Sequence, residues 1–166
     1  MSIIPMRILG ALVTVVLVGG LSALPAQAAP VRDSAITVTA ETATRTSTVP
    51  FRKRALRVAR AQKGDPYRWG AAGPNAFDCS GLTSFAYKRI GKTLPRTSSQ
   101  QRSATKRIRP GQARRGDLVF FHGRNGVYHV GLYADRGRIW HSPKPGTRVH
   151  RTKIWTRSVS YGRVRR

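Results

Sequence analysis

The sequence predicts an α+β domain in which N-terminal helices pack on a curled antiparallel sheet. Apolar residues recur at helical spacing over residues 51–62 and again over residues 79–90. Downstream the pattern changes to short β-rich runs bounded by turn residues. Helices that precede a run of strands, rather than alternating with them, favour packing against one face of an antiparallel sheet.

Residues 1–28 have the layout of a secretory signal peptide. Arg7 precedes an apolar run, and the small-residue pattern Ala26-Gln27-Ala28 suits cleavage after Ala28. A retained membrane anchor is the alternative, but glycines interrupt the run and no stop-transfer flank follows it. We therefore expect a secreted protein, extracellular or wall-associated, with no membrane span after cleavage.

Residues 29–50 are rich in Thr, Ala and Ser and show no helical period, which predicts a disordered linker. Residues 51–166 then suit one domain with one modest core. Residues 51–62 predict a basic amphipathic helix, followed by Gly64. Its apolar stripe is narrow and rich in alanine, so we expect it to pack on the domain rather than on a membrane.

A second helix is predicted after a loop punctuated by glycine and proline. Asp78 is a good N-cap residue, and Gly91 can cap the other end. Cys79 therefore lies in the first turn of this helix. Four strands are predicted after it, the last of them the weakest, over residues 117–122, 127–134, 138–142 and 147–151.

The connection between the second and third of these strands places two histidines together. Residues 135–137, Asp-Arg-Gly, suit a three-residue hairpin loop, so that Ala134 faces Arg138. Counting outward, Gly131 faces His141, and His129 lies on the same face, diagonal to His141. A slip of one residue in the register would place the two rings on opposite faces.

Cys79 is the only cysteine, so a secreted chain offers it no partner for a disulfide. It is either buried and inert or retained for its reactivity. A helix N-terminus lowers the pKa of a thiol, while Asp78 opposes this unless its charge is engaged in capping. With His129 as base and His141 orienting it, Cys79 has the partners of a cysteine-peptidase nucleophile. The same three side chains also suit a zinc or copper site, although the short ligand spacing typical of such sites is absent.

Several ordered motifs carry a resemblance to a known family: "YRWGAAGPNAFDCSGLTSFAYKRIGKTLPRTSSQQ", "GDLVFFH" and "HVGLYADRGRIWHSP". Residues 52–149 resemble the NlpC-type cysteine peptidases of bacterial cell walls, a papain-like family. The resemblance implies a papain-like cysteine peptidase fold with Cys79 as nucleophile, His129 as base and His141 as the third polar residue. It also implies hydrolysis of peptide bonds in peptidoglycan stem peptides, commonly between D-glutamate and a diamino acid, without a cofactor or a metal.

The resemblance further implies that Tyr67 lies beside the nucleophile and that Asp78 and Ser80 contact substrate. Alternatively, Tyr67 fills the underside of its loop, Asp78 is only a helix cap and Ser80 only a first-turn hydroxyl. Arg96 and Ser98 also match family positions, but that segment is better explained as the start of a helix. The chain departs from the family at residues 70–73, Gly-Ala-Ala-Gly, where paired glycines are usual, and this puts substrate preference in doubt.

The net charge of +25 predicts anionic partners. For a secreted bacterial-type protein these are peptidoglycan, anionic wall polymers such as teichoic acids, or lipid head groups, and no nucleic-acid-binding motif is present. Alternatively, much of the charge only forms a solvated face. Three alternatives stay open: an N-acetylmuramoyl-L-alanine amidase using the same site, an acyl transferase, and a non-catalytic basic wall-binding protein.

Overall fold

The computed structural model describes residues 49–165, so the predicted signal peptide and nearly all of the predicted linker lie outside the described residues. The helices are α1 (Phe51–Ala61), α2 (Cys79–Lys88), α3 (Ser98–Ser103) and the 3₁₀ helix η1 (Pro110–Gln112). The strands are β1 (Lys106–Ile108), β2 (Leu118–Gly123), β3 (Gly126–Asp135), β4 (Arg138–His141), β5 (His150–Lys153) and β6 (Val159–Arg163). None of the helices in this range is both long and apolar enough to span a membrane.

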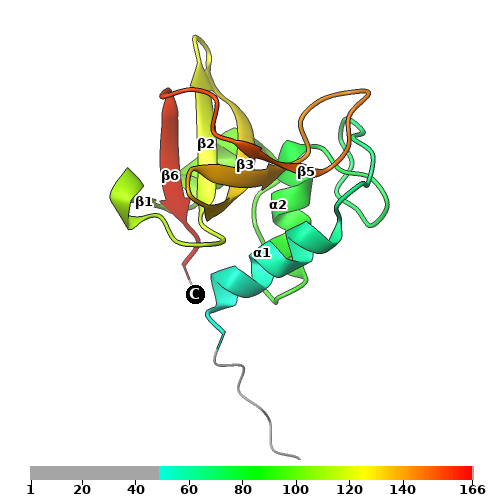
Figure 1. Ribbon diagram of the computed structural model, residues 1–166, viewed down its shortest axis with the longest axis horizontal. Coiled ribbons are helices and arrows are strands. Elements are labelled where there is room, and N and C mark those ends of the chain that lie inside the picture. Colours follow the sequence, from blue (N-terminus) through cyan, green and yellow to red (C-terminus); the bar gives the residue numbers. More distant parts are fainter. Residues whose placement is uncertain (1–48, 166) are drawn as a thin grey trace, which may run out of the picture. The chain divides into compact units, whose positions relative to one another are not determined.

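The strands form one antiparallel sheet in the order β1-β6-β2-β3-β4-β5. Helices packed on an antiparallel sheet confirm the predicted α+β class, and Figure 1 shows α1 and α2 together beside the sheet. The predicted fourth strand is shifted and runs from His150 rather than from residue 147. The sequence did not predict β1 or β6, and β6 pairs with β2 along four residues.

The core lies between the helices and one face of the sheet. Alternate residues of β2 and β3 contribute Leu118, Phe120, Val130 and Leu132, all fully buried, because successive side chains of a strand point to opposite faces. The apolar stripes of α1 and α2 cover them, and the rings of Phe51 and Tyr87 meet edge to face with centroids 5.8 Å apart. This packing fixes the position of α2 against β3.

The β3–β4 hairpin differs from its predicted form by one residue at the turn. Arg136 and Gly137 both have positive φ, 44° and 67°, and Asp135 rather than Ala134 pairs with Arg138. Such a two-residue turn matches the twist of the strands it joins. A bulge at Ala134 then restores the predicted register, so that Leu132 pairs with Trp140.

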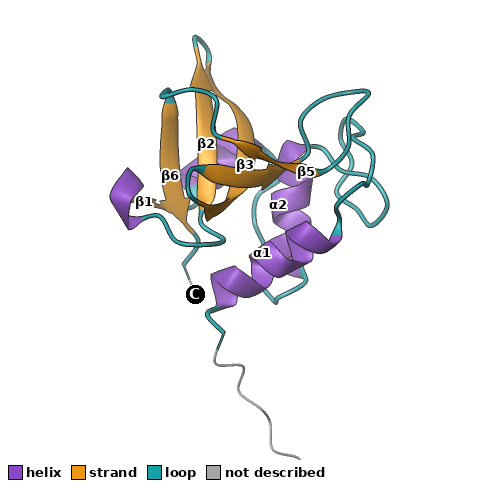
Figure 2. Cartoon of the chain, in the orientation of Figure 1, coloured by secondary structure: helices purple, strands orange, loops and turns teal. Residues whose placement is uncertain are grey.

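Two long loops that are distant in sequence run side by side at one end of the domain (Figure 2). The Tyr67 N–H donates to the Thr147 carbonyl at 2.9 Å, and the Val149 N–H donates to the Asp65 carbonyl at 2.8 Å. The first loop also contacts α2, because the Asp78 N–H donates to the Ala71 carbonyl at 2.9 Å. These bonds hold the loop that carries Tyr67 next to the start of α2.

Candidate active site

Cys79 is the first residue of α2, as predicted, and it is half-buried. Asp78 caps the helix, since its Oδ1 accepts a hydrogen bond from the Gly81 N–H at 2.7 Å. A Cβ at Gly81 would lie 2.0 Å from the Ala71 carbonyl oxygen, so only glycine lets the loop approach the first turn this closely. The Asp78 cap and the close approach of the loop at Gly81 therefore determine where the sulfur lies.

The sulfur of Cys79 faces β3. The Val130 N–H lies close enough to the sulfur to lower its pKa, as do the N–H and the hydroxyl of Ser80 in its own helix turn. Val130 directly follows His129, so the thiol and the predicted base come from adjacent points of α2 and β3. Within residues 49–165, however, the sulfur and the His129 ring form no direct hydrogen bond with each other.

The electrostatics of the thiol differ from the prediction that a helix terminus lowers its pKa. Burial raises the pKa of Cys79 above its ordinary value, and the neighbouring Asp78 carboxylate raises it further. The nearby Val130 N–H and the N–H and hydroxyl of Ser80 lower it, but they do not compensate. In this structure Cys79 is therefore a neutral thiol at neutral pH rather than a preformed thiolate.

Asp78 and Ser80, the predicted substrate-binding residues, are buried and form a polar network with the exposed side chain of Arg96. Arg96 Nη1 donates to Asp78 Oδ1 at 3.1 Å and to Ser80 Oγ at 3.0 Å, and its Nη2 also pairs with Asp78. The Gly70 N–H donates to Asp78 Oδ2 at 3.0 Å. The network connects the loop before α2 to the segment before α3. The pairing of Arg96 with Asp78 and Ser80 could not be identified from the sequence. Substrate contact by Asp78 and Ser80 stays a prediction.

Tyr67, which the resemblance places beside the nucleophile, is close enough to Cys79 and Asp78 for their charges to affect its pKa, and its place in the site stays a prediction. Its pKa is raised, first by burial and then by the proximity of Cys79 and Asp78. Its main chain is fixed by the bond to Thr147 and by an isolated bridge to Phe77. Of the two alanines that depart from the family pattern, Ala71 is half-buried against α2 and Ala72 is exposed.

His129 and His141 meet across β3 and β4, and both are buried. His129 Nε2 lies 2.9 Å from His141 Nδ1. Gly131 lies between them, and a Cβ there would stand 3.3 Å from the Cβ of His141. The structure thus confirms the predicted proximity of the two imidazoles and the space that glycine leaves between them.

His150, which the sequence left without a role, extends this pair to a row of three histidines. His141 Nε2 lies 3.3 Å from His150 Nε2, and His150 Nδ1 lies 2.8 Å from the Arg148 carbonyl oxygen. Because a carbonyl can only accept, His150 Nδ1 carries a proton and its Nε2 accepts from His141 Nε2–H. His141 Nδ1 is then an acceptor, so His129 Nε2–H donates to it. This assignment leaves His129 Nδ1 with a free lone pair.

Burial keeps both inner histidines uncharged. It lowers the pKa of His129 to about 4. The pKa of His141 falls to about 3, first through burial and then through the neighbouring His129 and His150. A neutral imidazole with an available lone pair can accept a proton from a thiol.

Aromatic side chains surround the histidine pair. Trp155 stacks on Phe121 with centroids 4.0 Å apart and an interplanar angle of 10°, and its ring centroid is 5.7 Å from that of His129. Trp155 and Tyr128 are half-exposed beside the histidines. No periodic pattern marks Trp155, so its position could not be predicted from the sequence.

The alternative metal site finds no support in the arrangement of these residues. Across residues 49–165, no group of three or more His, Cys, Asp or Glu side chains is arranged to hold a metal ion. The facing nitrogens of His129 and His141 are instead occupied by each other.

Residues 64–164 match the model of the NlpC/P60 family. The chain belongs to this family. It is 42% identical over 112 residues to the probable endopeptidase p60 of Listeria welshimeri, a match that covers 64% of this chain and 21% of that protein. It is 38% identical over 122 residues to the bifunctional muramidase/DL-endopeptidase CwlT of Bacillus subtilis, covering 69% of this chain and 37% of CwlT. The match therefore spans only a fifth to two fifths of these relatives.

The NlpC/P60 domain also has solved structural neighbours. One is RipD of Mycobacterium tuberculosis, described as a non-catalytic NlpC/p60 domain protein adapted to peptidoglycan binding. The superposition has a TM-score of 0.61 at 29% identity and covers 70% of this chain and 98% of RipD. These comparisons confirm the predicted family and the papain-like α+β fold.

Proposed function

We propose that this NlpC/P60 chain is a secreted cysteine peptidase that hydrolyses peptide bonds in peptidoglycan stem peptides. Cys79 is the nucleophile, His129 the general base and His141 the residue that orients His129. The names of the p60 and CwlT relatives support an endopeptidase, and the DL-endopeptidase name of CwlT supports cleavage between D-glutamate and a diamino acid. Tyr67 borders the nucleophile and helps to position the peptide.

One observation carries the proposal. The strand that places His129 against His141 also directs the Val130 N–H to the sulfur of Cys79. A half-buried thiol at a helix start, packed against the strand that carries a neutral and oriented imidazole, is an arrangement suited to nucleophilic catalysis.

The reaction starts from a neutral pair, because the pKa of the thiol is raised and that of His129 is lowered. His129 Nδ1 removes the thiol proton as the sulfur attacks the peptide carbonyl carbon. The Cys79 N–H, which has no hydrogen-bond partner among residues 49–165, stabilises the oxyanion that forms. The C–N bond then breaks, the His129 imidazolium gives its proton to the leaving amine, and a thioester remains.

Water completes the cycle. His129 removes a proton from the water molecule that attacks the thioester carbonyl, and the C–S bond breaks to release the carboxyl product. The proton returns to the sulfur. Throughout, His141 Nδ1 accepts from His129 Nε2–H and stabilises the transient positive charge.

Digestion of purified peptidoglycan tests this function. The full chain, Cys79→Ala and the exposed-surface control Ser103→Ala are compared, with mass spectrometry of the released fragments. We expect the wild type and Ser103→Ala to release peptides that begin with the diamino acid and to leave D-glutamate at the end of the peptide attached to the glycan. We expect Cys79→Ala to release none. Glycan strands stripped of whole stem peptides would instead identify an amidase, and products that persist with Cys79→Ala would refute the proposal.

A non-catalytic wall-binding protein is the second candidate, because RipD combines this fold with a peptidoglycan-binding role. Co-sedimentation with peptidoglycan separates the two functions. The enzyme proposal expects Cys79→Ala to bind peptidoglycan without turnover. Binding by a wild type that releases no fragments would favour the second candidate.

A further inference from the structure

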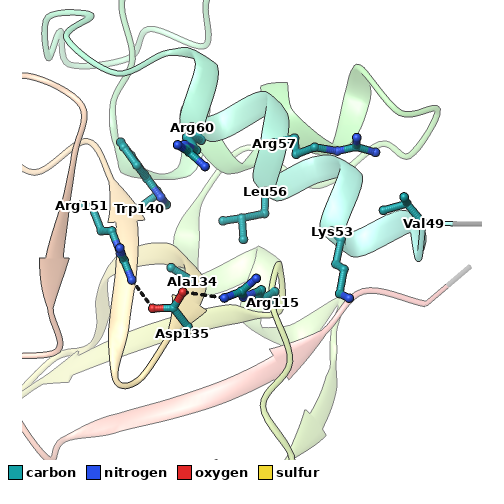
Figure 3. Close-up of a pocket in the computed structure, with 10 residues that line it drawn as sticks. All are labelled: Val49, Lys53, Leu56, Arg57, Arg60, Arg115, Ala134, Asp135, Trp140 and Arg151. Carbon is teal, nitrogen blue, oxygen red and sulfur yellow. Dashed lines mark hydrogen bonds and ion pairs between the residues drawn. The ribbon is translucent and has the colours of Figure 1, made fainter.

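A groove between α1 and the β3–β4 hairpin is separate from the candidate active site (Figure 3). It has a volume of about 480 Å³. Trp140 lines it, whereas His141, the next residue of β4, belongs to the histidine row on the other face of the sheet. We call this space the α1 groove and define it by Lys53, Arg57 and Arg60 of α1 with Arg115, Asp135, Trp140 and Arg151 opposite them.

Positive charge dominates the α1 groove. Five cationic side chains line it, together with a single carboxylate, Asp135. That carboxylate is already shared, since Arg115 and Arg151 both pair with it. Lys53, Arg57 and Arg60 have no carboxylate partner in the described part of the chain.

Part of the charge on α1 acts against the stability of the helix itself. Lys53, Arg57 and Arg60 are spaced three and four residues apart, where like charges repel each other. The first turn contains no acidic residue, although the helix dipole favours one there. A bound anion would offset both effects.

The shape of the groove favours an extended anion over a single small one. From residue 53 to residue 60 the helix rises about 10 Å, at about 1.5 Å per residue. Leu56, Ala134 and the edge of Trp140 form an apolar surface between the cations. Such a surface suits a ligand whose charges alternate with uncharged spacer units, and arginine forks bind phosphate oxygens in pairs.

We propose that the α1 groove binds a linear phosphodiester polymer of the cell wall, with uncharged polyol or sugar units between its phosphates. The groove would hold the domain on the wall while the thiol site meets peptide. This site is distinct from the thiol site and does not depend on catalysis, so a chain without turnover would still bind through it.

Two matched triple variants test the site. Lys53→Gln with Arg57→Gln and Arg60→Gln removes three charges from the groove. Lys106→Gln with Arg124→Gln and Arg157→Gln removes the same side-chain types from exposed positions elsewhere. Binding of the full chain to poly(glycerol phosphate) is measured at one fixed salt concentration, because such binding depends on salt.

We expect the affinity for poly(glycerol phosphate) to fall by about 10-fold or more in the groove variant. In the control variant it should fall by about threefold at most. Circular dichroism should show both variants folded. Equal losses in the two variants would mean that only net charge matters and would overturn the proposal.

The choice of probe separates the ligand classes. Polyglutamate of equal charge, phosphatidylglycerol vesicles and a single-stranded oligonucleotide are compared with poly(glycerol phosphate). The proposal expects wild type to bind poly(glycerol phosphate) most tightly. Equal binding of polyglutamate would refute phosphate recognition, and tighter binding of vesicles or of the oligonucleotide would refute the wall polymer.

A gain of affinity provides a test that misfolding cannot imitate. Asp135→Asn releases Arg115 and Arg151, so we expect binding about threefold tighter or more. Asp65→Asn makes the same change of charge away from the groove and should have a smaller effect. An equal gain in both variants, or a gain in neither, would contradict the assignment.

Discussion

His129 and His141 meet with their ring nitrogens 2.9 Å apart and their ring planes at 80° to each other. The contact joins two antiparallel strands and lies out of contact with bulk water, since each residue is at most 5% exposed. One nitrogen must donate and the other accept. The row that continues through His150 to the Arg148 carbonyl decides which one donates.

Replacing His141 tests whether it orients the base. His141→Ala leaves His129 Nε2–H without an acceptor, and we expect kcat to fall roughly 100-fold or more, as loss of an orienting residue does in related arrangements. His141→Asn supplies an amide oxygen as acceptor and should keep activity within about 10-fold of wild type. The measurement is turnover of a purified muropeptide, with thermal unfolding as the control for folding. Equal activity of wild type and His141→Ala would refute the orienting role.

The lowered pKa values predict loss of stability in mild acid. His129 has a pKa of about 4 in the folded protein, below the ordinary value of 6.5, so the unfolded chain binds more protons between these values. Stability is therefore fully present above pH 6.5 and decreases as the pH falls toward 4. For His129 alone the decrease is roughly 3 kcal/mol.

Urea unfolding at several pH values from 7 to 4 measures this slope. His129→Gln cannot titrate in this range. The slope of its free energy of unfolding against pH should therefore be smaller than that of wild type, by the equivalent of about one bound proton. His122→Gln is the control, because His122 bonds to Ser160 outside the histidine row. Parallel curves for wild type and His129→Gln would contradict the assignment of the lowered pKa to His129.

The positions of the main site residues follow from local sequence rules. An N-cap aspartate before helical spacing placed Cys79 at a helix start, and strand alternation with a turn signal placed His129 opposite His141. The turn was predicted one residue too long. The bulge at Ala134 compensated for this error, so the register farther along the strands was unaffected.

Features that depend on tertiary packing could not be predicted from the sequence. The raised pKa of Cys79 results from burial under β3, which no local pattern encodes. The contact of His150 requires the β4–β5 register, in which His141 pairs with His150 across a loop of irregular length. Strand β6 was missed because its burial does not alternate and its sequence includes Gly162 and Arg163.

His150 should act as a positioning residue of smaller effect. Removing it in His150→Ala takes away the acceptor of His141 Nε2–H, but His150 is exposed and water can replace it. We expect a decrease in kcat of roughly 3- to 10-fold with KM unchanged. His150→Gln, which offers an amide oxygen, should recover part of the loss. A change in KM alone would indicate substrate contact rather than positioning.

Gly131 should be required for the contact between the histidines. A Cβ at this position would lie 2.8 Å from Ile139 Cδ1 and 2.9 Å from the Trp140 carbonyl oxygen, so β4 must move away from β3. We expect Gly131→Ala to destabilise the fold by roughly 1–3 kcal/mol. Because it separates His141 from His129, we also expect turnover to fall roughly 10-fold or more, since small misplacements of catalytic groups are costly.

Gly111→Ala is the matched control, because nothing lies within 4 Å of the added Cβ. Its stability should stay within about 0.5 kcal/mol of wild type. Both variants are measured at a temperature well below their unfolding midpoints, so that a lower kcat of Gly131→Ala reports geometry rather than loss of folded protein. If Gly131→Ala were destabilised but fully active, the 2.9 Å contact between His129 and His141 would not limit catalysis.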